Sequence, residues 1–146
     1  MIEVLGQSAL TPYQQDIADT IRDSSSALLG IIDDVLDFSK IEAGKLEIER
    51  APLSIAAVVE GAADALQPLA AGRGVRLSVF VDPGLPVRLA GDAVRLRQIL
   101  TNLLGNAIKF SSGLERRGEV DVRALAGRDG TLSLVVEDNG IGMRAD

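Results

Sequence analysis

Apolar residues recur every three or four positions over residues 17–38, which is the spacing of one face of an α-helix. The predicted helix begins after Thr11, because Thr11, Pro12 and Gln14 have the residue types of an N-cap, a first helical position and a capping box. Gly44 is expected to end it. Such a long apolar face is typical of a four-helix bundle, and we expect it to pack in a dimer; a core helix of a monomer is the alternative.

A second amphipathic helix is predicted over residues 92–110, with Asp92 as its N-cap. Beside its apolar face it carries a stripe of four polar residues at helical spacing: Arg95, Asn102, Asn106 and Lys109. An asparagine inside a helix costs about half a kcal/mol relative to alanine, so helix preference does not explain the two amides. Amide oxygens can ligate Mg²⁺ and a lysine can bind phosphate oxygens, whereas a solvated polar face is the ordinary alternative.

The other segments predict an α+β layer. Residues 1–9 have the pattern of the last turns of an earlier helix, and 54–71 that of a further one. Alternation and turn residues predict short strands at 45–50, 75–81, 87–89, 119–126 and 131–137. This order of elements is expected to place two helices on one face of a mixed sheet.

Composition fits a globular protein and argues against several functions. Of the 146 residues 47% are apolar, and the net charge of −6 argues against nucleic acid as the main partner. A local basic neighbourhood suited to phosphate remains at Arg95, Arg97, Lys109, Arg116 and Arg117. Neither a membrane-spanning run nor a signal peptide is found, so we expect a cytoplasmic segment without membrane contact, although its parent could be anchored. Neither cysteine nor histidine is present.

Two motifs taken together resemble those of sensor histidine kinases, which have a Bergerat-fold ATP-binding domain. Asn102-x-x-x-Asn106-Ala-x-Lys109-Phe110 is similar to their N box. Asp138-x-Gly140-x-Gly142, which follows the last predicted strand, is similar to their G1 box, although an Asn-Gly pair alone more often marks a hairpin turn. Residues 11–45 also resemble the second helix and exit of the dimerisation and phosphotransfer domain.

The resemblance implies two domains. Residues 1–44 would be a helical-hairpin or four-helix-bundle segment for dimerisation and phosphotransfer, with most of its first helix missing. Residues 45–146 would be a partial Bergerat α/β sandwich that binds ATP.

The resemblance also implies roles for the residues of the helical stripe. Asn106 would ligate the Mg²⁺ that bridges the ATP phosphates, and Asn102 would support it from one turn earlier. Lys109 would lie along the phosphates, with help from Arg95. The hydrolysing ATPases of the superfamily carry an acidic residue near the position of Asn102; an amide cannot accept a proton from water, which favours a site that holds ATP without hydrolysing it.

The G1-like motif would bind the adenine end of the nucleotide. Asp138 would accept a hydrogen bond from the adenine amino group. Gly140 and Gly142 would let the backbone approach the nucleotide and leave the following lid free to move.

The chain departs from the family in lacking a phosphoacceptor histidine and in ending at Asp146, before the expected F box and G2 lid. We therefore expect a fragment, truncated at both ends, of a two-component kinase that uses Mg-ATP to phosphorylate a histidine absent from this chain and relays the phosphate to a response regulator. Alone it is expected to be inactive. Its expected partners are a second copy, through the helix at 11–44, and a receiver domain. The alternative is a non-catalytic docking module for an intact kinase or response regulator.

Overall fold

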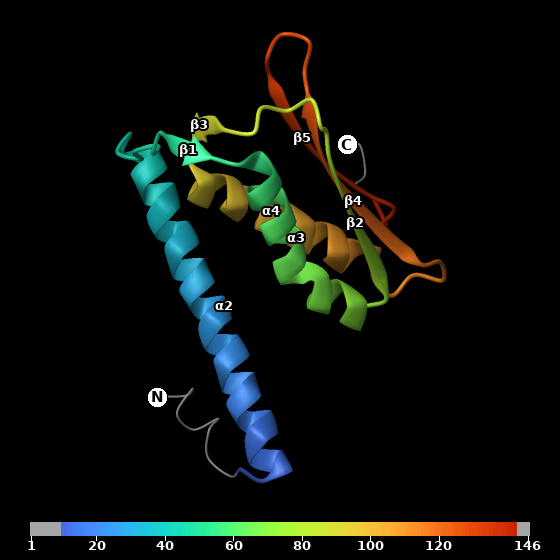
Figure 1. Ribbon diagram of the computed structural model, residues 1–146. Coiled ribbons are helices and arrows are strands. Elements are labelled where there is room, and N and C mark those ends of the chain that lie inside the picture. Colours follow the sequence, from blue (N-terminus) through green and yellow to red (C-terminus); the bar gives the residue numbers. More distant parts are fainter. Residues whose placement is uncertain (1–9, 143–146) are drawn as a thin grey trace. The chain divides into compact units, whose positions relative to one another are not determined.

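The computed structural model describes residues 10–142, and the chain divides between Glu47 and Ile48 into two compact units, each described here by itself (Figure 1). The first unit contains helix α2 (Pro12–Glu42). Thr11 Oγ1 accepts a hydrogen bond from the backbone N–H of Gln14 at 3.3 Å, and Gln14 Oε1 accepts one from the N–H of Thr11 at 3.0 Å. The predicted capping box is therefore confirmed.

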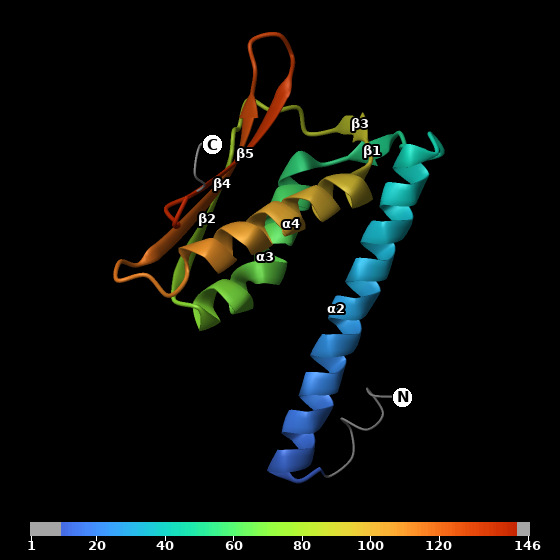
Figure 2. The same cartoon turned by 180° about the vertical axis from the view of Figure 1, so that it is seen from behind.

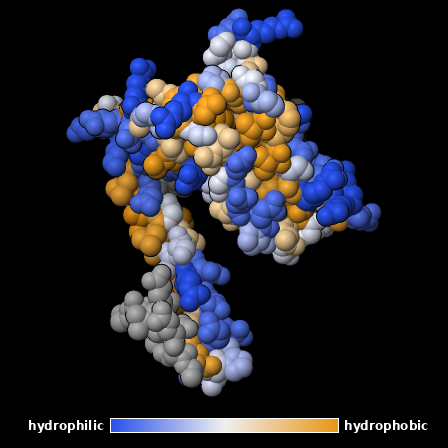
Figure 3. Space-filling view, viewed as in Figure 1, coloured by the Kyte–Doolittle hydropathy of each residue, from blue (hydrophilic) through white to orange (hydrophobic). Residues whose placement is uncertain are grey.

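The apolar face of α2 is exposed to solvent. Its exposed large side chains include Ile17, Ile21, Leu28, Ile31, Ile32, Val35 and Leu36. Figure 3 shows apolar surface on this helix. The helix ends at Glu42 with Ala43 as its C-cap, and Gly44 follows with a φ of 63°, as expected for a glycine that stops a helix. The helical turns expected at residues 1–9 lie outside the described residues.

The second unit is a layer of two helices on one face of a three-stranded sheet (Figures 1 and 2). The helices are α3 (Ile55–Gly72) and α4 (Ala93–Ser111). The strands, in their spatial order, are β2 (Val75–Val81), β4 (Gly118–Ala126) and β5 (Leu132–Asp138). Strand β2 pairs with β4 in parallel, and β5 pairs with β4 in antiparallel orientation. The predicted mixed sheet is therefore confirmed.

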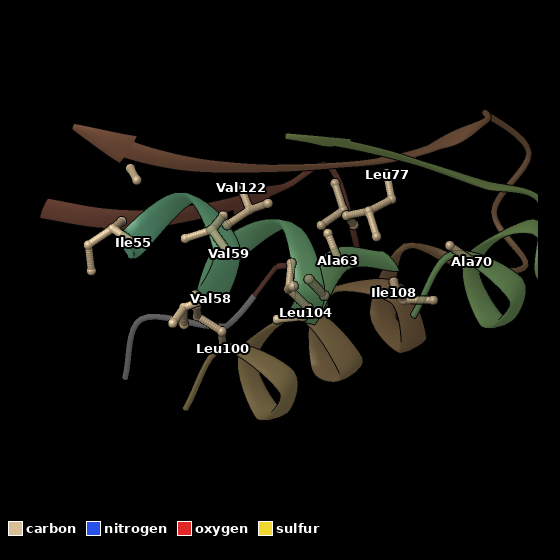
Figure 4. Close-up of a cluster of buried hydrophobic side chains, with 14 of the residues drawn as sticks. Ile55, Val58, Val59, Ala63, Ala70, Leu77, Leu100, Leu104, Ile108 and Val122 are labelled. Atoms are coloured by element: carbon tan, nitrogen blue, oxygen red, sulfur yellow. The ribbon is translucent and has the colours of Figure 1, made fainter. Parts of the chain in front are cut away.

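The core lies between the two helices and this sheet. Alternate residues of β4, among them Val120 and Val122, are fully buried, because every second side chain of a strand points to the same face. They meet the buried stripes of the helices, which include Val59, Ala63, Leu100, Leu104 and Ile108 (Figure 4). Burying each large side chain contributes about 1.5–3 kcal/mol, so the inner face of α4 is held firmly.

Two predicted strand positions are wrong. Residues 45–50 are not a strand; β1 is Ala51–Leu53, and it pairs with β3, which is Leu89–Gly91 and not 87–89. The alternation at 45–50 does not reflect a buried face, since Ile48 is exposed. The two strands form three residue pairs, and this short ladder leaves little local pattern in the sequence.

Asp92 ties the start of the second unit to α4. Its Oδ1 accepts a hydrogen bond from the N–H of Arg95 at 3.0 Å, which confirms the predicted N-cap, and its Oδ2 accepts one from the N–H of Glu49 at 3.1 Å. The bonds from Arg95 and Glu49 lower the pKa of the Asp92 carboxyl below its ordinary value of 3.8, because they stabilise the ionised form.

We predict that Asp92→Ala lowers the melting temperature at pH 7, because two backbone donors lose their acceptor. Since the folded-state pKa is lowered, this stabilisation is present above the unfolded-state pKa and is lost as the pH falls through the folded-state value. The difference between the wild type and the variant should thus shrink below pH 3.8 in thermal unfolding followed by circular dichroism. Asp129→Ala, in the exposed β4–β5 turn, is the control and should melt like the wild type. A difference that does not change with acidification would contradict this account.

Candidate functional site

The polar stripe of α4 faces away from the core. Asn102, Asn106 and Lys109 are exposed, on the side of the helix opposite Leu100, Leu104 and Ile108. Within residues 10–142, the amides of Asn102 and Asn106 make no hydrogen bond. Both amide oxygens are therefore accessible to a ligand.

Arg95 lies on the same stripe but at the beginning of the helix, roughly 10 Å before Asn102 at 1.5 Å per residue. Its side chain is half-buried, and its Nη1 donates a hydrogen bond to Gln98 Oε1 at 2.9 Å. The structure therefore brings Asn102, Asn106 and Lys109 close together and holds Arg95 apart, in contact with its own helical turn.

Asp138 is the last residue of β5, on the face of the sheet that the helices cover. It pairs with Val120, which is fully buried on that face, and paired residues of an antiparallel ladder point to the same side. Its Oδ1 accepts a hydrogen bond from the N–H of Gly140 at 2.8 Å. Within the described residues, its Oδ2 makes no hydrogen bond, so one exposed carboxylate oxygen remains available.

The glycine-rich loop after β5 lies against the last turn of α4. The N–H of Ile141 donates a hydrogen bond to the backbone oxygen of Phe110 at 3.3 Å. A Cβ atom on Gly140 would lie 2.6 Å from that oxygen, closer than atoms can approach. A residue without a side chain is thus needed at position 140, and the loop is brought to the end of α4 that carries Lys109.

Two further features characterise the corner that is formed by the end of α4 and the glycine-rich loop. Lys109 Nζ lies 5.4 Å from the centre of the Phe110 ring, which is a cation–π distance. Gly142 has a φ of 71°, a conformation that residues with side chains rarely adopt. The corner therefore combines a cation, amide oxygens and a carboxylate.

These donors fit a magnesium ion carried by a polyphosphate. Mg²⁺ takes oxygen ligands, keeps several waters and binds proteins through one or two side chains plus the phosphates of its substrate. The unbonded amide oxygen of Asn106 can supply such a ligand, and Lys109 can neutralise phosphate charge.

The sequence pattern did not reveal how Arg116 and Asn139 act in this corner. Arg116 was included only in a basic neighbourhood suited to phosphate, yet its guanidinium donates hydrogen bonds to the backbone oxygens of Asn139 and Gly140. Asn139 in turn bonds to the beginning of β4. Only the loop geometry of the folded chain reveals these contacts.

Two family models match the chain. Residues 1–44 match the His Kinase A (phospho-acceptor) domain, and residues 91–146 match the histidine kinase-, DNA gyrase B-, and HSP90-like ATPase family. Within the described residues, no helix is both long and apolar enough to cross a membrane.

Curated relatives are much longer than this chain. It is similar to the sensor histidine kinase GacS of Pseudomonas protegens, with 40% identity over 96% of the chain and 15% of the relative. It is also similar to the signal transduction histidine-protein kinase BarA of Escherichia coli K12, with 38% identity over 94% of the chain and 15% of the relative. The chain thus spans about 15% of the length of these relatives.

Solved structures show a similar fold. Full-length ShkA in complex with AMPPNP matches with a TM-score of 0.76 and 33% identity, over 99% of this chain and 30% of that one. The Acinetobacter baumannii histidine kinase AdeS matches with a TM-score of 0.73 and 18% identity, over 97% and 66%. The histidine kinase ThkA in complex with the response regulator protein TrrA matches with a TM-score of 0.52 and 17% identity, over 84% and 35%. The last two support the fold alone.

We predict that Gly140→Ala destabilises the chain by about 1–3 kcal/mol, because its methyl group would force the loop away from the Phe110 oxygen. Gly105→Ala, in the interior of α4, is the matched control: its Cβ would meet nothing within 4 Å, and alanine is expected to stabilise the helix by about 0.5–1 kcal/mol. Urea unfolding followed by circular dichroism measures both. Equal effects of the two substitutions would refute the close approach.

Proposed function

The chain belongs to the sensor histidine kinases, and from that premise we propose that residues 45–146 are part of an ATP-binding domain and that residues 1–44 serve dimerisation and phosphotransfer. The observation that carries the proposal is the contact of the glycine loop with the end of α4, through the hydrogen bond from Ile141 to Phe110. This contact brings the carboxylate of Asp138 towards the end of the row formed by Asn102, Asn106 and Lys109. Such a set of groups suits an adenine nucleotide with its metal-bound phosphates.

At the phosphate end, Asn106 would supply its amide oxygen to Mg²⁺ and Asn102 would support it from one turn earlier. Both amides lack hydrogen bonds within residues 10–142, so binding costs no existing contact. Lys109 leaves the Phe110 ring to reach the phosphates. Arg95 assists only if its guanidinium reaches past Gln98, with which it is paired.

At the adenine end, Asp138 accepts a hydrogen bond from the exocyclic amino group through its available oxygen, which distinguishes adenine from guanine. The N–H of Gly140 already bonds to the other carboxylate oxygen and orients the group. Gly140 and Gly142 keep this loop free of side chains, so that the backbone can approach the nucleotide.

The chemistry of this site is positioning and charge neutralisation, which is most of what phosphoryl transfer requires of a protein. Bound Mg²⁺ would supply charge stabilisation for the phosphates. Where a hydrolase carries a catalytic base, this chain carries the amide of Asn102. An amide cannot accept a proton, so water is not activated there. The chain contains no histidine, so the phosphoacceptor lies outside these 146 residues and the chain alone is inactive as an autokinase. The phosphate would then pass to the receiver domain of a response regulator.

A non-catalytic docking module is the less favoured alternative. The match of residues 91–146 to the ATPase family concerns a part of the chain that such a module would not need.

We predict that the 146-residue chain binds a non-hydrolysable ATP analogue more tightly with Mg²⁺ than without it in calorimetric titration. Asn106→Ala should abolish the gain from Mg²⁺. Asp138→Ala should weaken binding about tenfold to a hundredfold with or without Mg²⁺, because a hydrogen bond to a charged group is lost.

Asp121→Ala is the control for the loss of a carboxylate. Asp121 pairs with Glu137 on the other face of the sheet, so its removal should leave the affinity unchanged. Mg²⁺-dependent binding that survives in both site variants would rule out the proposed site. Absence of any binding by a folded wild-type chain would mean that these residues do not form a working site by themselves.

Dimerisation through α2 is the second part of the proposal. Leu28 and Val35 are 59% and 58% exposed on the same face of this helix, a large apolar area to leave in water. Pairing two copies into a bundle would bury this face.

We predict that the chain is dimeric in size-exclusion chromatography with light scattering, and that Leu28→Asp or Val35→Asp makes it monomeric by placing a charge in the apolar interface. Ser26→Asp adds the same charge on the opposite, exposed side of α2 and should leave the dimer intact. A monomeric wild type would refute this part of the proposal without affecting the nucleotide site.

A further inference from the structure

The loop after β5 is held by two polar side chains, Arg116 and Asn139, to which the proposed function gives no role. Arg116 Nη2 donates hydrogen bonds to the backbone oxygens of Asn139 and Gly140, the latter at 3.1 Å. Both oxygens belong to the segment between Asp138 and Gly142. One end of a single guanidinium therefore bridges two successive peptide groups of the loop.

Asn139 fastens the same segment to the beginning of β4. Its Oδ1 accepts a hydrogen bond from the N–H of Glu119 at 2.9 Å, and its Nδ2 donates one to the oxygen of Arg117 at 3.0 Å. Its own N–H donates to the oxygen of Glu119 at 3.1 Å. The side chain thus continues the strand pairing beyond the end of the ladder at Asp138.

A loop that contains two glycines needs such hydrogen bonds to be held in one conformation. Glycine loses more conformational freedom on ordering than any other residue, so an unfastened loop would have to be ordered at the expense of binding free energy. Groups ordered before binding avoid this cost.

We propose that Arg116 is a positioning residue for the nucleotide: by holding the backbone oxygens of Asn139 and Gly140, it keeps the Asp138 carboxylate and the glycine backbone in the binding geometry before the nucleotide arrives. This inference rests on the proposed function of the loop. It gives Arg116 a role different from the direct phosphate contact that its charge alone suggests.

Amide hydrogen exchange without nucleotide tests the fastening itself. Arg116→Ala is expected to speed exchange of the N–H groups of Ile141 and Asn139 about threefold to tenfold, because the loop opens more often. Arg117→Ala is the matched control: it removes the same charge from the neighbouring position, and within residues 10–142 the Arg117 side chain makes no hydrogen bond or ion pair. Equal exchange in the wild type and in Arg116→Ala would overturn the proposal.

Nucleotide affinity then separates positioning from phosphate contact. Arg116→Ala should weaken binding of AMP, ADP and the ATP analogue by the same factor, about threefold to tenfold, since the loop binds the base they share. A loss that grows with the number of phosphates would overturn the proposal in favour of a direct contact. If the wild-type chain binds no nucleotide, the proposed function fails, and the exchange experiment still decides whether Arg116 orders the loop.

Discussion

The site depends on one steric constraint, the approach of the glycine loop to the carbonyl end of α4. There is no room for a side chain at Gly140, because the Phe110 oxygen occupies that space. The hydrogen bond from Ile141 to the same oxygen uses a helix-terminal acceptor that has no partner within its own helix. One contact therefore completes the end of the helix and places the loop beside it.

Helix α4 has a buried apolar face and, opposite it, an exposed polar face. Leu100, Leu104 and Ile108 are fully buried against α3 and the sheet, and this packing determines the position of the exposed amides across the helix. A small shift in the core would displace Asn106 relative to Asp138. Core packing and ligand geometry are thus coupled through a single rigid element.

Local signals in the sequence predicted most of the fold. The caps at Thr11 and Asp92 were correct because a cap depends on residues within one helical turn. The positions of β1 and β3 were wrong because a three-residue ladder depends on a distant partner. The stripe of α4 was correctly predicted to be polar and to lie on one face, but neither the pairing of Arg95 with Gln98 nor the bonds of Arg116 follow from spacing. Both depend on side-chain conformations in the folded chain.

The parallel pairing of β2 with β4 has a consequence for how the site can open. Parallel neighbours need a crossover connection, and here α4 lies in that connection, between strands whose first residues Val75 and Gly118 are partners. Detaching the exposed residues of this helix would also pull Leu100, Leu104 and Ile108 out of the core, so opening there costs more free energy than opening of the loop. The glycine loop follows an edge strand and can open locally. Under the proposed function, nucleotide release would then be governed by the loop, while Asn102 and Asn106 stay in place between successive ligands.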